Sequence, residues 1–255
     1  MEHLHEHHME HNTIFNQPPY NKLKAINKTQ IKQIPDRTIR LILDGDMKRF
    51  VWTINGKILA EATPINVRKG ETVRIIFENR SMMHHPMHLH GHFFRVLNDF
   101  GEYSPLKHSV DIPPMGERII EFYAGEDKDW ALHCHILYHM KAGMMTYVHY
   151  EDSDLDPEII AARNLETNDL TKDPYYFWAD MGLYTNMLDA KLNLSNSRNI
   201  FLLEAKYDWE KDYEIELNYL RYMNRYFSLL AGVKKEEDEK TKIKAGFKYL
   251  LPLLI

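Results

Sequence analysis

The sequence holds a single cysteine, Cys134, among its 255 residues. An intrachain disulfide needs two cysteines, so this crosslink is excluded. Without disulfides, the cysteine content does not indicate whether the protein works in an oxidising compartment. Because histidines flank Cys134 on both sides, a metal ligand explains it better than a structural thiol.

Long apolar runs are also missing. No stretch approaches the about 18 consecutive apolar residues that mark a membrane-spanning helix, and residues 1–5 lack the charged and then apolar layout of a signal peptide. These residues therefore predict neither a helical anchor nor an export signal.

An excess of positive charge is absent as well. The formal net charge is −5 at pH 7, and the lysines and arginines form no basic cluster. Nucleic-acid binding needs a concentrated basic surface to neutralise phosphates, so we exclude that class of function. The length and the 44% hydrophobic content suit one large or two modest domains, and we expect two.

Cys134 lies in the segment His133-Cys134-His135, and His139 and Met144 follow it. One thiolate, two imidazoles and a weak axial thioether are the ligands of a blue copper centre. If the segment is extended, Cys134 points to one face of a strand and its two neighbouring histidines point to the other. One strand would thus serve two metal sites, joined by a short covalent path that suits electron transfer.

A second segment, HPMHLHGH at residues 85–92, repeats the pattern, because His88 and His90 share one strand face. Together the two segments resemble the third and fourth copper motifs of the multicopper oxidases, HPxHLHGH and HCHxxxHxxxxM. Residues 18–150 most resemble the C-terminal domain of the CopA type of bacterial copper-resistance oxidase, through residues 20–24, 47–52, 81–83, 107–108 and 138–140.

The resemblance implies a copper-binding role for each motif residue. The type 1 copper ligands would be His85, Cys134 and His139, with Met144 in the axial position. The type 2 ligand would be His88, and the type 3 ligands would be His90, His133 and His135. Electrons from a small reducing substrate, Cu(I) or a phenol, would pass through the catalytic residues Cys134, His133 and His135 to a trinuclear copper site that reduces O2 to water in copper resistance.

The chain departs from the family at the trinuclear site. Half of the family's ligands there come from HxH pairs of an N-terminal cupredoxin domain, and this chain has no such pair in a strand context. We therefore expect the missing N-terminal domain, another subunit or a homo-oligomer to supply them. The alternative is a non-enzymatic copper binder or one-electron carrier. The family implies a periplasmic or outer-membrane-associated location, and without a signal peptide the sequence reads like the tail of a longer protein.

Short alternating segments separated by turns predict an all-β fold for residues 18–150, a cupredoxin Greek-key sandwich. Before it, residues 1–17 form a tail rich in histidine and methionine that could collect copper ions. After it, residues 151–173 are interpreted as a linker with one short helix at residues 158–163.

The last part of the chain, residues 174–255, alternates apolar and charged residues in four segments, at residues 201–209, 213–219, 227–233 and 243–249. Amphipathic antiparallel strands have this pattern, and so do outer-membrane β-barrels, with about ten residues per strand. The similarity of residues 207–251 to CopB-type copper-resistance proteins implies an incomplete, barrel-like sheet and outer-membrane association. Four or five such strands cannot close, because the smallest natural barrels have about eight.

Overall fold

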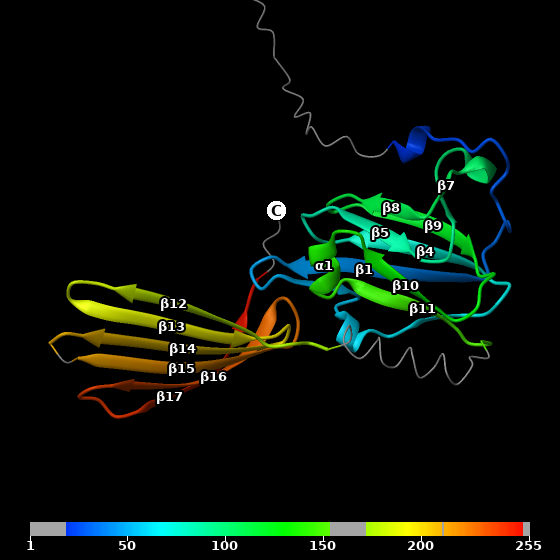
Figure 1. The fold of residues 1–255 in the computed structure, drawn as a ribbon. Coiled ribbons are helices and arrows are strands. Elements are labelled where there is room, and N and C mark those ends of the chain that lie inside the picture. Colours follow the sequence, from blue (N-terminus) through cyan, green and yellow to red (C-terminus); the bar gives the residue numbers. More distant parts are fainter. Residues whose placement is uncertain (1–18, 154–171, 211, 252–255) are drawn as a thin grey trace, which may run out of the picture.

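The computed structural model describes residues 19–153, 172–210 and 212–251. There the chain forms a β-sandwich of two sheets and a third, separate sheet from its C-terminal part (Figure 1). The predicted histidine- and methionine-rich tail and the short helix of the predicted linker lie outside the described residues.

The first sheet of the sandwich has six strands in the order β2-β1-β4-β9-β6-β7. Their bounds are β1 Arg37–Asp46, β2 Val51–Ile54, β4 Thr72–Asn79, β6 Phe94–Val96, β7 Leu106–Lys107 and β9 Glu117–Tyr123. β1 and β4 are parallel, and the other neighbours are antiparallel. After β2, Asn55 and Gly56 both have positive φ angles, as a tight turn requires.

The second sheet has five strands in the order β3-β11-β10-β5-β8. Their bounds are β3 Ile65–Val67, β5 His85–Leu89, β8 Ser109–Ile112, β10 Asp129–Cys134 and β11 Met145–Tyr150. The two histidine-rich segments of the sequence, on β5 and β10, are thus paired neighbours in the sheet.

Helical structure in the sandwich is short. The 3-10 helices are η1 Tyr20–Lys22, η2 Leu59–Glu61 and η3 Gly101–Tyr103, and the helix α1 spans Leu137–Lys141 directly after β10. Within the described part of the chain, no helix has the length and apolarity needed to cross a membrane.

The core of the sandwich lies between the inner faces of the two sheets. On β4, Val73, Ile75 and Phe77 are fully buried and the residues between them are less so, as the alternation in the sequence predicts. Met87 of β5 and Leu132 of β10 belong to the same core cluster. Each large apolar side chain buried in this way contributes about 1.5–3 kcal/mol. The predicted all-β cupredoxin sandwich is confirmed.

The third sheet is antiparallel and has six strands in sequence order. They are β12 Tyr176–Leu183, β13 Met187–Ser195, β14 Asn199–Asp208, β15 Tyr213–Tyr222, β16 Phe227–Glu236 and β17 Lys242–Tyr249. The sequence predicted the last four strands but missed β12 and β13. In β12, the consecutive aromatic residues Phe177 and Trp178 project to opposite faces, which obscures the two-residue period.

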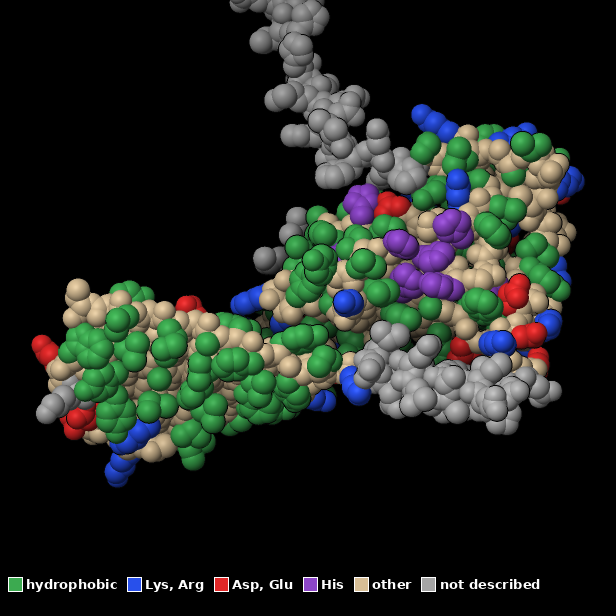
Figure 2. Space-filling view, in the orientation of Figure 1, with side chains coloured by type: hydrophobic (Ala, Val, Ile, Leu, Met, Phe, Trp, Pro, Cys, Tyr) green, Lys and Arg blue, Asp and Glu red, His purple; other side chains and the backbone are tan. Residues whose placement is uncertain are grey.

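The two faces of the third sheet differ in chemistry. One face carries apolar side chains that remain exposed, among them Met181, Leu194, Leu217, Val233 and Ile243. Figure 2 shows hydrophobic side chains spread over this part of the molecule. The other face carries ion pairs between strands. Lys191 pairs with Glu204 and Lys234 with Glu214 on neighbouring strands, and Lys244 of β17 reaches Glu216 of β15 across β16.

Three arginines join the third sheet to the sandwich. Arg49, in the turn after β1, donates to the carbonyl of Ser197 at 2.7 Å, and its guanidinium lies 3.9 Å from the centre of the Tyr222 ring. In the reverse direction, Arg198 donates to the carbonyl of Gly56 at 2.8 Å. The third arginine, Arg225, forms an ion pair with Asp44 of β1 at 2.7 Å.

A prediction on packing concerns Gly45 of β1, which lies against the buried ring of Trp52. A Cβ atom at Gly45 would come within 2.1 Å of that ring. We expect Gly45→Ala to lower the free energy of unfolding by about 1–3 kcal/mol, the usual cost of an overpacked core, measured by chemical denaturation. Gly246→Ala on β17, where an added Cβ meets nothing within 4 Å, is the control. Equal stability of Gly45→Ala and the unsubstituted protein would contradict this packing.

Candidate metal centre

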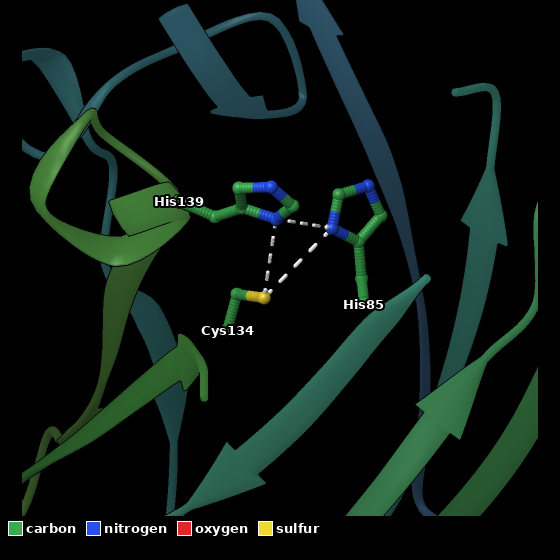
Figure 3. Close-up of side chains that lie close together, drawn as sticks. All are labelled: His85, Cys134 and His139. Atoms are coloured by element: carbon green, nitrogen blue, oxygen red, sulfur yellow. Dashed lines mark hydrogen bonds between the residues drawn. The ribbon is translucent and has the colours of Figure 1, made fainter. Parts of the chain in front are cut away.

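Three side chains that could bind a metal meet at one end of the sandwich. His85 begins β5, Cys134 ends β10 and His139 lies in α1. The Cys134 Sγ atom is 3.8 Å from Nδ1 of His85 and 3.7 Å from Nδ1 of His139, and the two Nδ1 atoms are 3.2 Å apart (Figure 3). The three ligand atoms lie within 4.8 Å of one another.

The strand period of β10 explains how Cys134 reaches this group. Cys134 faces Met87 across the pairing of β10 with β5, and both are fully buried in the core. The neighbouring His133 points to the other face of the same sheet, where it meets His90. After Cys134 the chain turns into α1, and this helix brings His139 back over the sulfur.

Met144 follows α1 and is fully buried beside the same strand. Its N–H donates to the carbonyl of His139 at 2.9 Å, and its carbonyl accepts from the N–H of Cys134 at 3.1 Å. The preceding Gly143 has a φ of +119°, and a Cβ there would lie 2.6 Å from the carbonyl oxygen of Trp52. Glycine is therefore required at this position for the chain to carry Met144 back along β10.

Burial governs the electrostatics of the three donors. It lowers the pKa of His85 to about 3, with a further contribution from nearby His139, and it also lowers the pKa of His139. It raises the pKa of Cys134 to about 12. In the metal-free protein the group therefore consists of neutral imidazoles and a neutral thiol. The donors have the soft and borderline character that copper prefers, and a metal cation would compensate the charge of a buried thiolate.

Trp52 of β2 forms one wall of the group. Its ring stacks on that of His139 with centroids 3.9 Å apart and an interplanar angle of 25°, and it meets the His85 ring edge to face at 5.2 Å. The backbone N–H of Trp52 donates to the carbonyl of Ala142 just after α1. Trp52 was not singled out from the sequence. It appeared there only within residues 47–52, one of the segments that carry the family resemblance.

The remaining motif histidines form a second cluster on the opposite face of the sheet. The His90 and His133 Nε2 atoms are 2.9 Å apart, and the rings of His88 and His90 have centroids 4.7 Å apart. The His135 ring lies 5.8 Å from that of His88 and 6.0 Å from that of His133. Burial also lowers the pKa of His90 and of His133. Histidine side chains gather on one face of the sandwich (Figure 2).

Three further contacts hold this second cluster. His92 lies 2.8 Å from the carbonyl of His90 through Nδ1 and 2.6 Å from the Tyr150 hydroxyl through Nε2. His88 donates from Nδ1 to the carbonyl of His108 at 2.6 Å. This bond fixes the proton of a neutral His88 on Nδ1 and leaves Nε2 as its metal-binding atom. His92 thus holds the backbone of His90.

Comparison with known proteins finds a family for the sandwich. Residues 33–154 match the family model described as multicopper oxidase. Residues 33–154 are a multicopper oxidase domain. The chain is 39% identical over 133 residues to copper resistance protein A of Pseudomonas syringae pv. tomato, a match that covers 52% of this chain and 22% of that protein. It is 35% identical over 116 residues to the multicopper oxidase MmcO of Mycobacterium tuberculosis, covering 46% and 23%.

Among solved structures, the McoA multicopper oxidase of Aquifex aeolicus is 29% identical with a TM-score of 0.41, covering 48% of this chain and 31% of that one. The matches span only about a fifth of the length of the curated relatives. The predicted family resemblance is confirmed, and the cofactor of such a domain is copper.

A prediction on the thiol follows from its burial. With its pKa raised to about 12, Cys134 of the metal-free protein remains a protonated thiol at neutral pH. We expect it to react with a chromogenic thiol reagent far more slowly in the native protein than in denaturant, because the thiolate is the nucleophile. Cys134→Ser supplies the blank. Equal rates in the native and the denatured protein would contradict the buried position of the sulfur.

Proposed function

We propose that this chain is the copper-binding domain of an oxidase that takes electrons from a reduced substrate and delivers them to O2. Type 1 copper would be held by His85, Cys134, His139 and Met144. The type 2 ligand would be His88, and the type 3 ligands would be His90, His133 and His135. Bound copper would supply one-electron transfer and dioxygen reduction, because thiolate and thioether favour Cu(I) while imidazoles accept Cu(II).

The observation that carries this proposal is the position of Cys134 on β10. Its sulfur lies in the buried group with His85 and His139, while the adjacent His133 belongs to the second cluster. The backbone of one strand therefore joins the two groups of donors. In the proposed activity, Cys134, His133 and His135 form the covalent path between the metal sites.

The reducing substrate we favour is Cu(I), with a phenol as the other candidate. The side chains of Met82 and Met115 are 72% and 66% exposed, and thioethers favour Cu(I). The N–H of Met115 donates to the carbonyl of Ser81, whose hydroxyl contacts His85. Met87, by contrast, is fully buried and packs in the core.

The second cluster holds half of the ligands that a trinuclear site needs. His90 and His135 are exposed, so ligands from outside this domain have access to them. We propose that an N-terminal cupredoxin domain, another subunit or a second copy of the chain supplies the other histidines, and that the assembled protein works in the periplasm or at the outer membrane in copper resistance.

A second candidate is a non-enzymatic copper binder or electron carrier. It is favoured because only one of the two groups of donors brings three ligand atoms close together within the described residues. The residues His85, Cys134 and His139 are the one set within the described ranges whose three ligand atoms meet within 4.8 Å. The three donors proposed for type 1 copper thus all come from this chain, whereas the proposed trinuclear site would need further histidines from elsewhere.

The third sheet is proposed to associate with the outer membrane. Its apolar face carries exposed side chains such as Leu217 and Ile243 (49% and 84% exposed), and aromatic residues such as Tyr207 and Phe247 lie toward its two ends. Membrane-facing sheets have an apolar band flanked by aromatic residues, with a polar opposite face. The ion pairs of the opposite face agree with that division.

The copper proposal predicts an intense blue absorption band with about one tightly bound copper ion per chain, since a thiolate, two imidazoles and an axial thioether form a blue copper site. The measurement is the visible spectrum of the copper-loaded chain with copper analysis and oxygen uptake on Cu(I). We expect the band to disappear in Cys134→Ala and the isolated chain to take up no oxygen. A wild-type protein without a blue band would contradict the type 1 assignment.

The oxygen measurement separates the two candidates. Oxygen uptake that appears when an N-terminal cupredoxin domain is added, or when the chain oligomerises, would support the oxidase and exclude a simple carrier. His90→Ala is the matched variant, because it removes a ligand of the second cluster only. We expect it to keep the blue band and to lose the restored uptake.

The membrane proposal predicts that the chain binds lipid vesicles through the apolar face of the third sheet. Leu217→Lys places a charge in the centre of that face, where such a charge costs about 2–4 kcal/mol at the bilayer midplane, so we expect less protein to float with the vesicles. The control, Glu204→Lys, places the same charge on the opposite face of the neighbouring strand. Flotation that is equal in the two variants would contradict this role.

A further inference from the structure

Ser81 lies in the loop between β4 and β5 and is almost fully buried. Its Oγ atom is 2.7 Å from Nε2 of His85, the ring nitrogen that faces away from Cys134. No motif in the sequence singled out this serine as a site residue. Its hydroxyl is nevertheless in direct contact with one of the three metal donors.

The orientation of the Asn79 amide determines which way the Ser81 hydroxyl points. The Nδ2 group of Asn79 faces three backbone carbonyls, those of Met83 at 2.7 Å, Pro113 at 2.9 Å and Ile112 at 3.2 Å. Only the amino side of the amide can donate to carbonyl oxygens. The Oδ1 atom must therefore face Ser81, where it accepts from the Ser81 backbone N–H at 2.9 Å.

The Ser81 hydroxyl has one proton, which it donates in a hydrogen bond toward carbonyl oxygens. The Oγ atom lies 2.9 Å from Oδ1 of Asn79 and 3.3 Å from the carbonyl of Met83, and both of these atoms can only accept. The N–H of Met83 donates to Oγ at 3.2 Å. One lone pair of Oγ remains for the His85 ring, so the hydroxyl accepts there and the Nε2 atom of His85 is the donor.

A neutral imidazole carries its one proton on one of its two ring nitrogens. With the proton on Nε2, the Nδ1 atom of His85 keeps its lone pair, and Nδ1 is the atom that faces Sγ of Cys134 and Nδ1 of His139. We propose that Ser81, oriented by Asn79, is a positioning residue that holds His85 in the Nε2–H tautomer and so prepares Nδ1 for copper.

The two histidines of the group are held in different ways. No residue in the described ranges makes a hydrogen bond to Nε2 of His139, whose ring is fixed by stacking on Trp52. Of these two histidines, only His85 therefore has its tautomer set by a hydroxyl. Loss of the Ser81 hydroxyl should therefore change the His85 ring and leave the stacking of His139 in place.

The role of the tautomer in copper binding rests on the proposed function. The tautomer itself can be tested in the metal-free protein. The test uses long-range proton–nitrogen NMR spectra of the metal-free chain labelled with nitrogen-15 in its histidines, and His85→Gln identifies the His85 signals. We expect the pure Nε2–H pattern in the wild type and in Ser81→Thr, which keeps the hydroxyl. In Ser81→Ala we expect a mixture of the two tautomers.

Ser104→Ala is the matched control. Ser104 is also fully buried and its hydroxyl donates to a carbonyl, that of Gly101 at 2.8 Å, but it belongs to the loop after β6 and contacts no metal donor. We expect it to lose stability without any change in the His85 pattern. An Nδ1–H pattern for His85 in the wild type would overturn the proposal even if Ser81→Ala did not fold, and so would an unchanged pattern in folded Ser81→Ala.

Copper affinity gives a second readout, by competition with a Cu(I) chelator. Loss of a hydrogen-bond partner of a metal ligand weakens metal binding by about 10- to 100-fold, which we expect for Ser81→Ala and not for Ser104→Ala or Ser81→Thr. Equal affinities in Ser81→Ala and the wild type would overturn the role in metal binding. A wild-type chain that binds no copper would instead contradict the proposed function, while the NMR result would still decide the tautomer.

Discussion

The burial of a thiol and two imidazoles at one place, those of Cys134, His85 and His139, is the constraint on which the rest of the sandwich depends. A thiol and two imidazoles occupy space that apolar side chains fill elsewhere in the core, and their pKa values shift toward the neutral forms. Several features of the fold serve this group. β10 runs through the sheet between β5 and β11, Gly143 permits the return of the chain after α1, and Trp52 closes the wall beside His139.

Much of this arrangement could be predicted from the sequence because strand geometry is periodic. Alternation along β10 separates Cys134 from His133, and the structure places them in two different groups of donors. The contribution of Trp52 could not be predicted, since it reaches the group through tertiary contacts with residues distant in the sequence. That of Ser81 could not be predicted either, because its hydroxyl meets His85, four residues further on, through an irregular loop that has no period. Nor was α1 predicted, because a helix of five residues gives no period. The predicted ligand roles remain proposals.

The third sheet differs from the sandwich because it leaves many apolar side chains exposed. It also contacts the turn after β1, which lies close to His139. Its apolar side chains stay exposed, so apolar packing within the chain does not account for them. Arg49 contacts Ser197 and Tyr222 of the sheet, and the next residue, Phe50, meets the ring of His139 at 6.4 Å. The turn after β1 thus contacts both the third sheet and the ring of His139.

The most direct test of a copper site built on Cys134 is X-ray absorption at the copper edge, recorded on the chain loaded with one equivalent of copper. The account requires a short copper–sulfur distance together with nitrogen ligands, and it requires the sulfur contribution to be lost in Cys134→Ala and kept in His90→Ala. Copper surrounded only by nitrogen and oxygen in the wild-type chain would contradict it, because the buried thiol and its two imidazoles would then not be the preferred site.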